Sequence, residues 1–236
     1  MNRLYLVRHG ENPANLTKQF SHRQIDYSLN AKGVLQAQQT AAYFQQHTTL
    51  HAVYSSPLKR AYETGGIIAA PFGLTVSALE QFREINIGDL EMQPVSDELW
   101  AYHERIVDQW YAGRTDLRFP GGEDYRSLLE RIRAGLVQVL AGRQEQNVVV
   151  VGHGGWFRCT LKDLCANVDA SLLRTLDNHN CSVTELHAEV VDGQLHARLV
   201  RYADHSHLHG AAAALIAGTP VEGELPRLGH EYPPAP

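Results

Sequence analysis

Cysteine is scarce in this chain of 236 residues, and Cys159, Cys165 and Cys181 form no Cys-x-x-Cys pair. An odd number without such spacing indicates neither a disulfide framework nor a structural zinc site. Apolar runs of membrane-spanning length and a secretory signal pattern are lacking as well. We therefore expect a soluble, cytoplasmic protein without a membrane partner.

An excess of positive charge is also absent, since the formal net charge is −5. Nucleic acids are bound by basic faces, so a nucleic-acid partner is not expected. The chain has no P-loop, no His-Glu-x-x-His and no Gly-x-Ser-x-Gly elbow. A dinucleotide fingerprint starting at Gly152 fails because Phe157 stands where its third glycine is needed.

The order of apolar runs and amphipathic segments predicts one α/β domain over residues 1–210, followed by an Ala/Gly/Pro-rich tail over 211–236. We expect a three-layer α/β/α sandwich with a mostly parallel central sheet, helices on both faces and an antiparallel edge strand. That edge comes from two runs joined by an Asp192-Gly193 turn. Strands are predicted at 4–7, 52–54, 74–79, 147–151, 181–187 and 195–202. Helices are predicted after Asn30, from Ser56-Pro57, around 99–111, over about 128–140 and over 156–164.

Charged residues follow each of the predicted parallel strands. They are Arg8-His9, Arg60, Glu84 and His153. Taken singly, each is a common solvated side chain, but the carboxyl ends of strands are where open α/β sheets bind ligands. An arginine fork matches two phosphoryl oxygens, and a neutral imidazole can attack phosphorus. Together these residues predict a phosphoryl-transfer pocket that needs no metal and no cofactor.

Three segments leave alternatives open. Residues 12–29 form a long polar connection, a candidate functional loop. The aromatic and basic segment around 99–111 is either a lid or a surface helix packed on the domain. Three histidines at alternate positions, from His205 to His209, would share one face only if a strand persisted there, so a metal site is disfavoured.

Several motifs in combination resemble the histidine phosphatase superfamily, also called phosphoglycerate mutase-like. Two departures lie at the pocket rim, where Asn12 replaces the usual serine or threonine and His22 replaces a common glycine. The resemblance extends over about the first 210 residues. The matching stretches are Leu6-Val7-Arg8-His9-Gly10-Glu11, residues 55–64, Glu84 with Gly88, Pro120-Gly121-Gly122-Glu123, Gly152-His153-Gly154, Asn180-Cys181-Ser182 and His207-Leu208.

This resemblance implies that His9 is a phosphorylated nucleophile and that Glu84 protonates the leaving oxygen. Arg8, Arg60 and His153 are implied to hold the phosphoryl group. Asn15, Ser21 and Gly154 complete the expected phosphate- and substrate-binding set.

Three functions remain open on these residues: a phosphatase, in which water takes the phosphoryl group, a mutase, in which a second hydroxyl takes it, and a phospho-ligand-binding module without turnover. The segment between Glu91 and Gly122 lacks the longer insertion of bisphosphoglycerate-dependent mutases, which favours a phosphatase. The expected substrate is a small phosphomonoester such as a phosphosugar, phosphoglycerate, phosphoserine or ribazole phosphate. Homodimer formation is left open.

Overall fold

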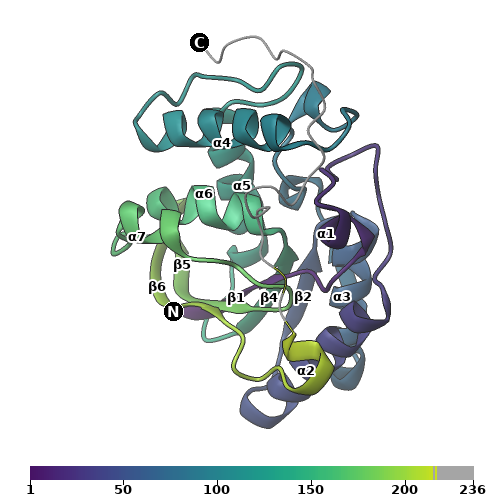
Figure 1. Ribbon diagram of the computed structural model, residues 1–236. Helices are drawn as coiled ribbons and strands as arrows, with labels where there is room; N and C mark the ends of the chain where they lie inside the picture. Colours follow the sequence, from purple (N-terminus) through teal and green to yellow (C-terminus); the bar gives the residue numbers. More distant parts are fainter. Residues whose placement is uncertain (215, 217–236) are drawn as a thin grey trace.

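A six-stranded mixed sheet forms the centre of the computed structural model, which describes residues 1–214 and 216 (Figure 1). The strand order is β3-β2-β4-β1-β5-β6. The first four of these strands are parallel, whereas β5 pairs antiparallel with both β1 and the edge strand β6. The strands are β1 (Asn2–Arg8), β2 (Ala52–Ser55), β3 (Val76–Ala78), β4 (Asn147–Gly152), β5 (Val183–Val191) and β6 (Gln194–Asp204). The predicted fold class is confirmed.

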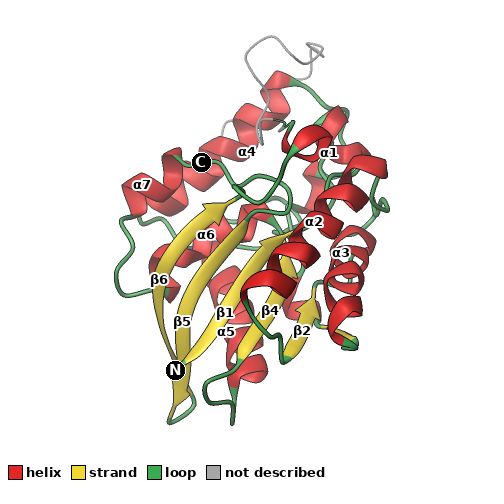
Figure 2. Ribbon diagram, turned by 90° about the horizontal axis from the view of Figure 1, so that it is seen from below, coloured by secondary structure: helices red, strands yellow, loops and turns green. Residues whose placement is uncertain are grey.

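Both faces of the sheet are buried, because successive side chains of a strand point to opposite faces. Leu4 and Leu6 belong to one apolar core, and Tyr5 and Val7 to another. The first core includes side chains of α5 (Tyr125–Leu140) and α6 (Gly154–Leu164). The second includes those of α2 (Ala31–His47) and α3 (Lys59–Ala69). Figure 2 shows the resulting layers, with α2 in front of the sheet and α5 and α6 behind it.

Helix α4 (Asp97–Tyr111) is a packed helix rather than a detached flap. Its N-cap is Ser96, whose hydroxyl accepts from the Leu99 N–H at 3.1 Å. Trp110 is buried and donates its indole N–H to the Leu117 carbonyl at 2.7 Å. The aromatic side of α4 packs in the core, as one of the two interpretations of this segment predicts, and a lid role for the segment stays a prediction.

Short helices complete the chain. They are α1 (Pro13–Thr17), α7 (Ala170–Thr175), and the 3₁₀ turns η1 (Ala70–Phe72), η2 (Glu80–Phe82), η3 (Gly88–Leu90) and η4 (Gly210–Ala213). The η4 turn contains the first residues of the predicted tail and packs on α2, where Gln36 donates to the Ala212 carbonyl at 3.1 Å. The rest of that predicted tail, residues 215 and 217–236, lies outside the described residues.

Two predicted helix starts are wrong, and both errors have the same cause. Helix α3 begins at Lys59, not at Pro57, and its N-cap Leu58 provides no side-chain bond. The Lys59 N–H instead donates to the carboxylate of Asp26 at 2.9 Å. Helix α6 begins at Gly154, before the predicted Trp156. Its first N–H groups are likewise satisfied by a distant carboxylate, described below, so local capping rules could not locate either start.

Two further findings concern the part of the chain that the structure describes. None of its helices combines the length and the apolar character needed to cross a bilayer. Nor do three or more of its His, Cys, Asp and Glu side chains gather in a way that could hold a metal. The three histidines from His205 onward diverge, and His207 contacts the Thr40 hydroxyl at 3.0 Å.

Candidate active site

A pocket of about 170 Å³ lies at the carboxyl ends of β1 and β4, where predicted site residues come together. His153 adjoins it, with its ring centroid 5.1 Å from that of His9. The sequence-predicted residues that line the pocket are Arg8, His9, Asn15, Ser21, Arg60, Glu84 and Gly154.

His9 is buried and held in one tautomer by its own backbone. Its Nδ1 lies 2.8 Å from the Gly10 carbonyl, which can only accept, so Nδ1 carries the proton. Its Nε2 accepts from the Nε–H of Arg60 at 3.2 Å and therefore keeps a lone pair. Burial, with the charges of Arg60 and Arg8, lowers the pKa of His9 well below its usual value. At neutral pH the imidazole is therefore uncharged.

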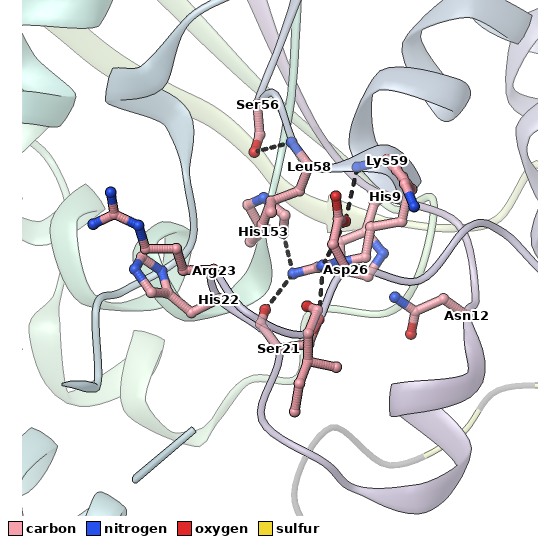
Figure 3. Close-up of polar contacts among 12 residues, drawn as sticks. His9, Asn12, Ser21, His22, Arg23, Asp26, Ser56, Leu58, Lys59 and His153 are labelled. Carbon is pink, nitrogen blue, oxygen red and sulfur yellow. Dashed lines mark hydrogen bonds and ion pairs between the residues drawn. The ribbon is translucent and has the colours of Figure 1, made fainter. Parts of the chain in front are cut away.

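Arg60 is the hub of the charged cluster and is only 3% exposed. Besides His9, its guanidinium donates to the Ser21 hydroxyl at 2.9 Å, the Ser21 carbonyl at 2.6 Å and His153 Nδ1 at 3.2 Å. His9, His153 and Ser21, the three residues to which Arg60 donates, come from different segments and lie close together in Figure 3. Burial lowers the pKa of Arg60 to about 10, so it remains cationic at neutral pH.

Two buried donors in this cluster have no hydrogen-bond partner among the described residues: Arg8 Nε and His153 Nε2. Since His153 Nδ1 accepts from Arg60, Nε2 carries the proton of the neutral ring. Burial and the charge of Arg60 lower the pKa of His153 well below its usual value. Leaving a buried N–H without an acceptor is costly, so the pair suits an anionic ligand that accepts from both.

Glu84 is held at the N-terminus of α6. One carboxylate oxygen accepts from the Gly155 N–H and the other from the Trp156 N–H, each at 3.0 Å. These are early N–H groups of the helix, which have no partner within it, and the helix dipole favours negative charge there. Gly155 is required for this approach, because an added Cβ would lie 2.7 Å from the carboxylate.

The backbone that carries Glu84 is clamped by Arg131 from α5. Arg131 donates to the carbonyls of Gln81 at 2.6 Å, Arg83 at 2.9 Å and Glu84 at 3.0 Å. Glu123 pairs with Arg131 at 2.7 Å and also accepts from the Asn86 N–H at 2.7 Å. The acid residue is therefore fixed from two helices, α5 through its backbone and α6 through its side chain.

Aromatic and apolar groups line another part of the pocket. Phe20, Trp100 and His103 contact one another, with ring centroids 4.4 Å apart for Phe20 and Trp100 and 5.1 Å for Phe20 and His103. Ile85 and Ile87 line the pocket directly after Glu84. We call Phe20, Ile85, Ile87, Trp100 and His103 the aromatic end. Arg8, His9, Ser21, Arg60 and His153 form the basic end.

A sequence model of the histidine phosphatase superfamily (branch 1) matches residues 4–200. The chain belongs to this superfamily. The "Probable phosphoglycerate mutase GpmB" of Salmonella choleraesuis (strain SC-B67) is 32% identical over 186 residues, which are 79% of this chain and 85% of that protein. The fold of Bacillus stearothermophilus YhfR is similar, with a TM-score of 0.70, 25% identity and coverage of 88% of this chain and 99% of that one.

Two other structures resemble this superfamily member in fold. The mycobacterial glucosyl-3-phosphoglycerate phosphatase has a TM-score of 0.70 at 23% identity, covering 86% of this chain and 99% of its own. The α-ribazole phosphatase of Shigella flexneri has a TM-score of 0.66 at 21% identity, covering 86% of this chain and 96% of its own. The superfamily fold thus occurs with phosphatases that are named for different substrates.

Two rim residues that depart from the superfamily pattern have clear roles in this chain. Asn12 forms a reciprocal capping box with Asn15 at the start of α1, with both bonds at 3.1 Å. The Asn15 oxygen also accepts from Asn180 at 3.2 Å, so its amide N–H₂ is the group it can offer a ligand. His22 donates from Nδ1 to the Glu84 carbonyl at 2.8 Å and lines the pocket.

Sequence reasoning missed the residue that holds this superfamily member's pocket loop. One oxygen of Glu91, a residue only 3% exposed, accepts from four successive N–H groups at 2.7–3.1 Å, those of residues 22–25. Burial alone would raise the pKa of Glu91, but these donors outweigh it and lower the pKa. Nothing local distinguishes this glutamate from a solvated one, so only the folded chain could identify it.

Glu11, a second acidic residue near His9, points elsewhere. Its carboxylate accepts from Asn30 at 2.8 Å and pairs with Lys32 at 2.8 Å, at the start of α2. Glu11 does not line the pocket, which leaves Glu84 and Asp177 as the acidic residues among the described ones that do.

Proposed function

We propose that this chain is a metal-independent phosphomonoesterase that acts through a phosphohistidine on His9 and hydrolyses a small phosphorylated metabolite. The observation that carries the proposal is the tautomer of His9. Its proton is on Nδ1 and its Nε2 lone pair faces Arg60, in the pocket that also contains the Glu84 carboxyl. A nucleophile, cationic donors and an acid are the parts that phosphoryl transfer requires.

In the first step, His9 Nε2 attacks phosphorus and the bond from phosphorus to the ester oxygen breaks. The phosphoryl oxygens take the donors of Arg60, Arg8 Nε and His153 Nε2, and the last two lack partners among the residues that the structure describes. Protonated Glu84 gives its proton to the leaving oxygen, and the leaving group departs as a neutral alcohol. The cations supply the charge stabilisation that a metal provides in other phosphatases.

In the second step, Glu84 accepts a proton from water while the water oxygen attacks phosphorus. The N–P bond breaks, its electron pair returns to His9 Nε2, and inorganic phosphate leaves. Glu84 is then protonated for the next ester. The neutral state of His9, maintained by burial and the two arginines, restores the nucleophile without a separate deprotonation.

A mutase is the second candidate, and the observation that favours it is the 32% identity to a probable phosphoglycerate mutase. The short segment from Glu91 to Gly122, which contains α4, supports the phosphatase instead. The two functions differ in the acceptor of the phosphoryl group. A phosphatase releases inorganic phosphate stoichiometrically, whereas a mutase returns the group to a second hydroxyl.

The test is a panel of phosphomonoesters assayed with excess EDTA, followed by a search for acid-labile, base-stable phosphate on His9. We expect phosphate release to survive chelation and the phosphoenzyme to be trapped. Loss of activity in EDTA, restored by one divalent ion, would reject the mechanism. Isomerisation of phosphoglycerate without phosphate release would identify a mutase, and neither turnover nor phosphoenzyme would indicate a binding module.

A further inference from the structure

The aromatic end presents rings that are already fixed in place. The Trp100 indole N–H donates to the Lys18 carbonyl at 2.9 Å. His103 stacks on Phe119 with centroids 5.2 Å apart and bonds to Glu104 through Nδ1 at 3.0 Å. A flat ligand group can therefore contact this wall without the entropic cost of ordering it.

Apolar surface begins immediately beside the acid residue. Ile85 and Ile87, which follow Glu84 in the chain, are 2% and 3% exposed, and both line the pocket. A leaving group protonated by Glu84 therefore lies in a pocket whose wall includes these two side chains. Polar groups at that point would lose water without gaining a hydrogen-bond partner, whereas carbon atoms would gain from burial.

Charge in the pocket matches one phosphoryl group. The charged side chains that line it, among the described residues, are the cationic Arg8, Lys18, Arg60 and Arg158 and the acidic Glu84 and Asp177. Arg158 already donates to Glu104 at 3.2 Å, and Glu104 also accepts from Arg174 at 2.7 Å. In the proposed first step Glu84 is protonated, so Arg8, Lys18 and Arg60 against Asp177 leave an excess of two positive charges in the pocket. This excess matches the charge of a phosphoryl dianion. A second anionic group on the substrate would exceed the positive charge available.

The pocket has a volume of about 170 Å³, below the roughly 300–1,000 Å³ of pockets for drug-sized ligands. It accommodates a phosphoryl group with one small ring, and a larger group would extend through its open side. We propose that the aromatic end selects phosphomonoesters whose leaving group is a single uncharged ring-bearing alcohol, in preference to acidic leaving groups such as glycerate. This inference rests on the proposed function and names its substrate class.

Three esters of alkyl alcohols test the inference, because none has an unusually good leaving group: benzyl phosphate, glycerol phosphate and 3-phosphoglycerate. We expect kcat/KM for benzyl phosphate to exceed that for glycerol phosphate by about 10-fold and that for 3-phosphoglycerate by about 100-fold. A kcat/KM for 3-phosphoglycerate equal to or above that for benzyl phosphate would overturn the inference.

Variants of Trp100 test whether the preference for benzyl phosphate depends on the aromatic end. Trp100→Ala should lower kcat/KM for benzyl phosphate about 10-fold, mainly through KM, and leave glycerol phosphate within about 2-fold. Trp100→Phe keeps a ring and should retain most of the preference. Tyr62→Ala, on the exposed surface of α3, is the matched control. Unchanged inhibition by inorganic phosphate would show that the basic end is intact. Equal losses on all esters would contradict the inference.

Binding of non-hydrolysable analogues separates this inference from the proposed function. We expect calorimetry to show that benzylphosphonate binds wild type about 10-fold more tightly than 3-phosphonopropionate, which carries a second anion. That result would support the inference even if no ester were turned over, a case in which the proposed function alone would fail. Tighter binding of 3-phosphonopropionate would reject the inference while leaving hydrolysis untouched.

Discussion

The two ends of the pocket are built in different ways. At the basic end the main chain positions the chemistry: the Gly10 carbonyl sets the tautomer of His9, and the Ser21 carbonyl holds Arg60. At the aromatic end contacts between side chains predominate, as between Phe20 and Trp100 at 4.4 Å, and the Lys18 carbonyl is the main-chain group that holds Trp100. Side chains can be exchanged without moving the sheet. The reaction is therefore expected to be harder to alter by substitution than the choice of leaving group.

The largest expected effect comes from His9→Ala, which removes the proposed covalent acceptor from the basic end. We expect kcat/KM to fall by at least about 10³-fold with every ester, because no other group can take its place. The measurement is phosphate release by the purified variant. Glu11→Gln is the control, since its carboxylate lies outside the pocket. Retention of more than trace activity by His9→Ala would show that the reaction is not covalent at this residue.

Glu84→Gln tests whether Glu84 protonates the leaving group, because the loss of activity that it causes should then depend on the leaving group. We expect a loss of about 10²–10³-fold with alkyl phosphates, which need a proton at the leaving oxygen. With p-nitrophenyl phosphate, whose phenolate leaves without help, the loss should be about 10-fold and phospho-His9 should accumulate. Equal, slight losses with both kinds of ester would remove Glu84 from the acid role and direct attention to Asp177.

Glu91→Ala tests whether the loop between the two ends must be held. Four N–H groups would lose their shared acceptor, so we expect the free energy of unfolding to fall by about 2–3 kcal/mol. We also expect kcat/KM to fall about 10-fold for all esters, as Ser21 loses its place beside Arg60. Urea denaturation and steady-state kinetics measure the two effects. Glu80→Ala, at an exposed residue, is the control. Unchanged stability would show that the loop holds its own conformation.

The smallest effect concerns pH and the neutral histidines of the basic end. Their pKa values are lowered in the folded protein, so below about pH 6.5 the unfolded chain takes up protons that the folded chain does not. Stability should therefore fall with decreasing pH, by about 1 kcal/mol for each of the two histidines between pH 7.5 and about 5.5.

Histidine NMR on the free protein checks this directly. The ring signals of His9 and His153 should keep the positions of the neutral imidazole between about pH 8 and 5.5. A midpoint near pH 6.5 for His9 would mean that the arginines do not keep it neutral.

Features that depend on local sequence could be predicted before the structure was known. Short apolar runs predicted the position of every strand, because the spacing and composition of apolar residues indicate a strand that is buried on both faces of the sheet. The Asp192-Gly193 turn also follows from local preference, since both residues have positive φ angles, 49° and 75°. Arg8, His9, Arg60 and Glu84 could be placed in one pocket because parallel strands end at the same edge of a sheet.

Contacts between distant segments could not be predicted in this way. Asp26 caps α3, Glu84 caps α6 and Glu91 binds the loop at residues 22–25, and each contact joins a carboxylate to N–H groups far away in the chain. The sequence alone determined where the strands lie, which of them end in residues of the predicted site, and the family to which the chain belongs. Only the tertiary structure decided where α3 and α6 begin, how the carboxylate of Glu84 is held, and which rings line the pocket, because those depend on through-space partners that no local pattern encodes.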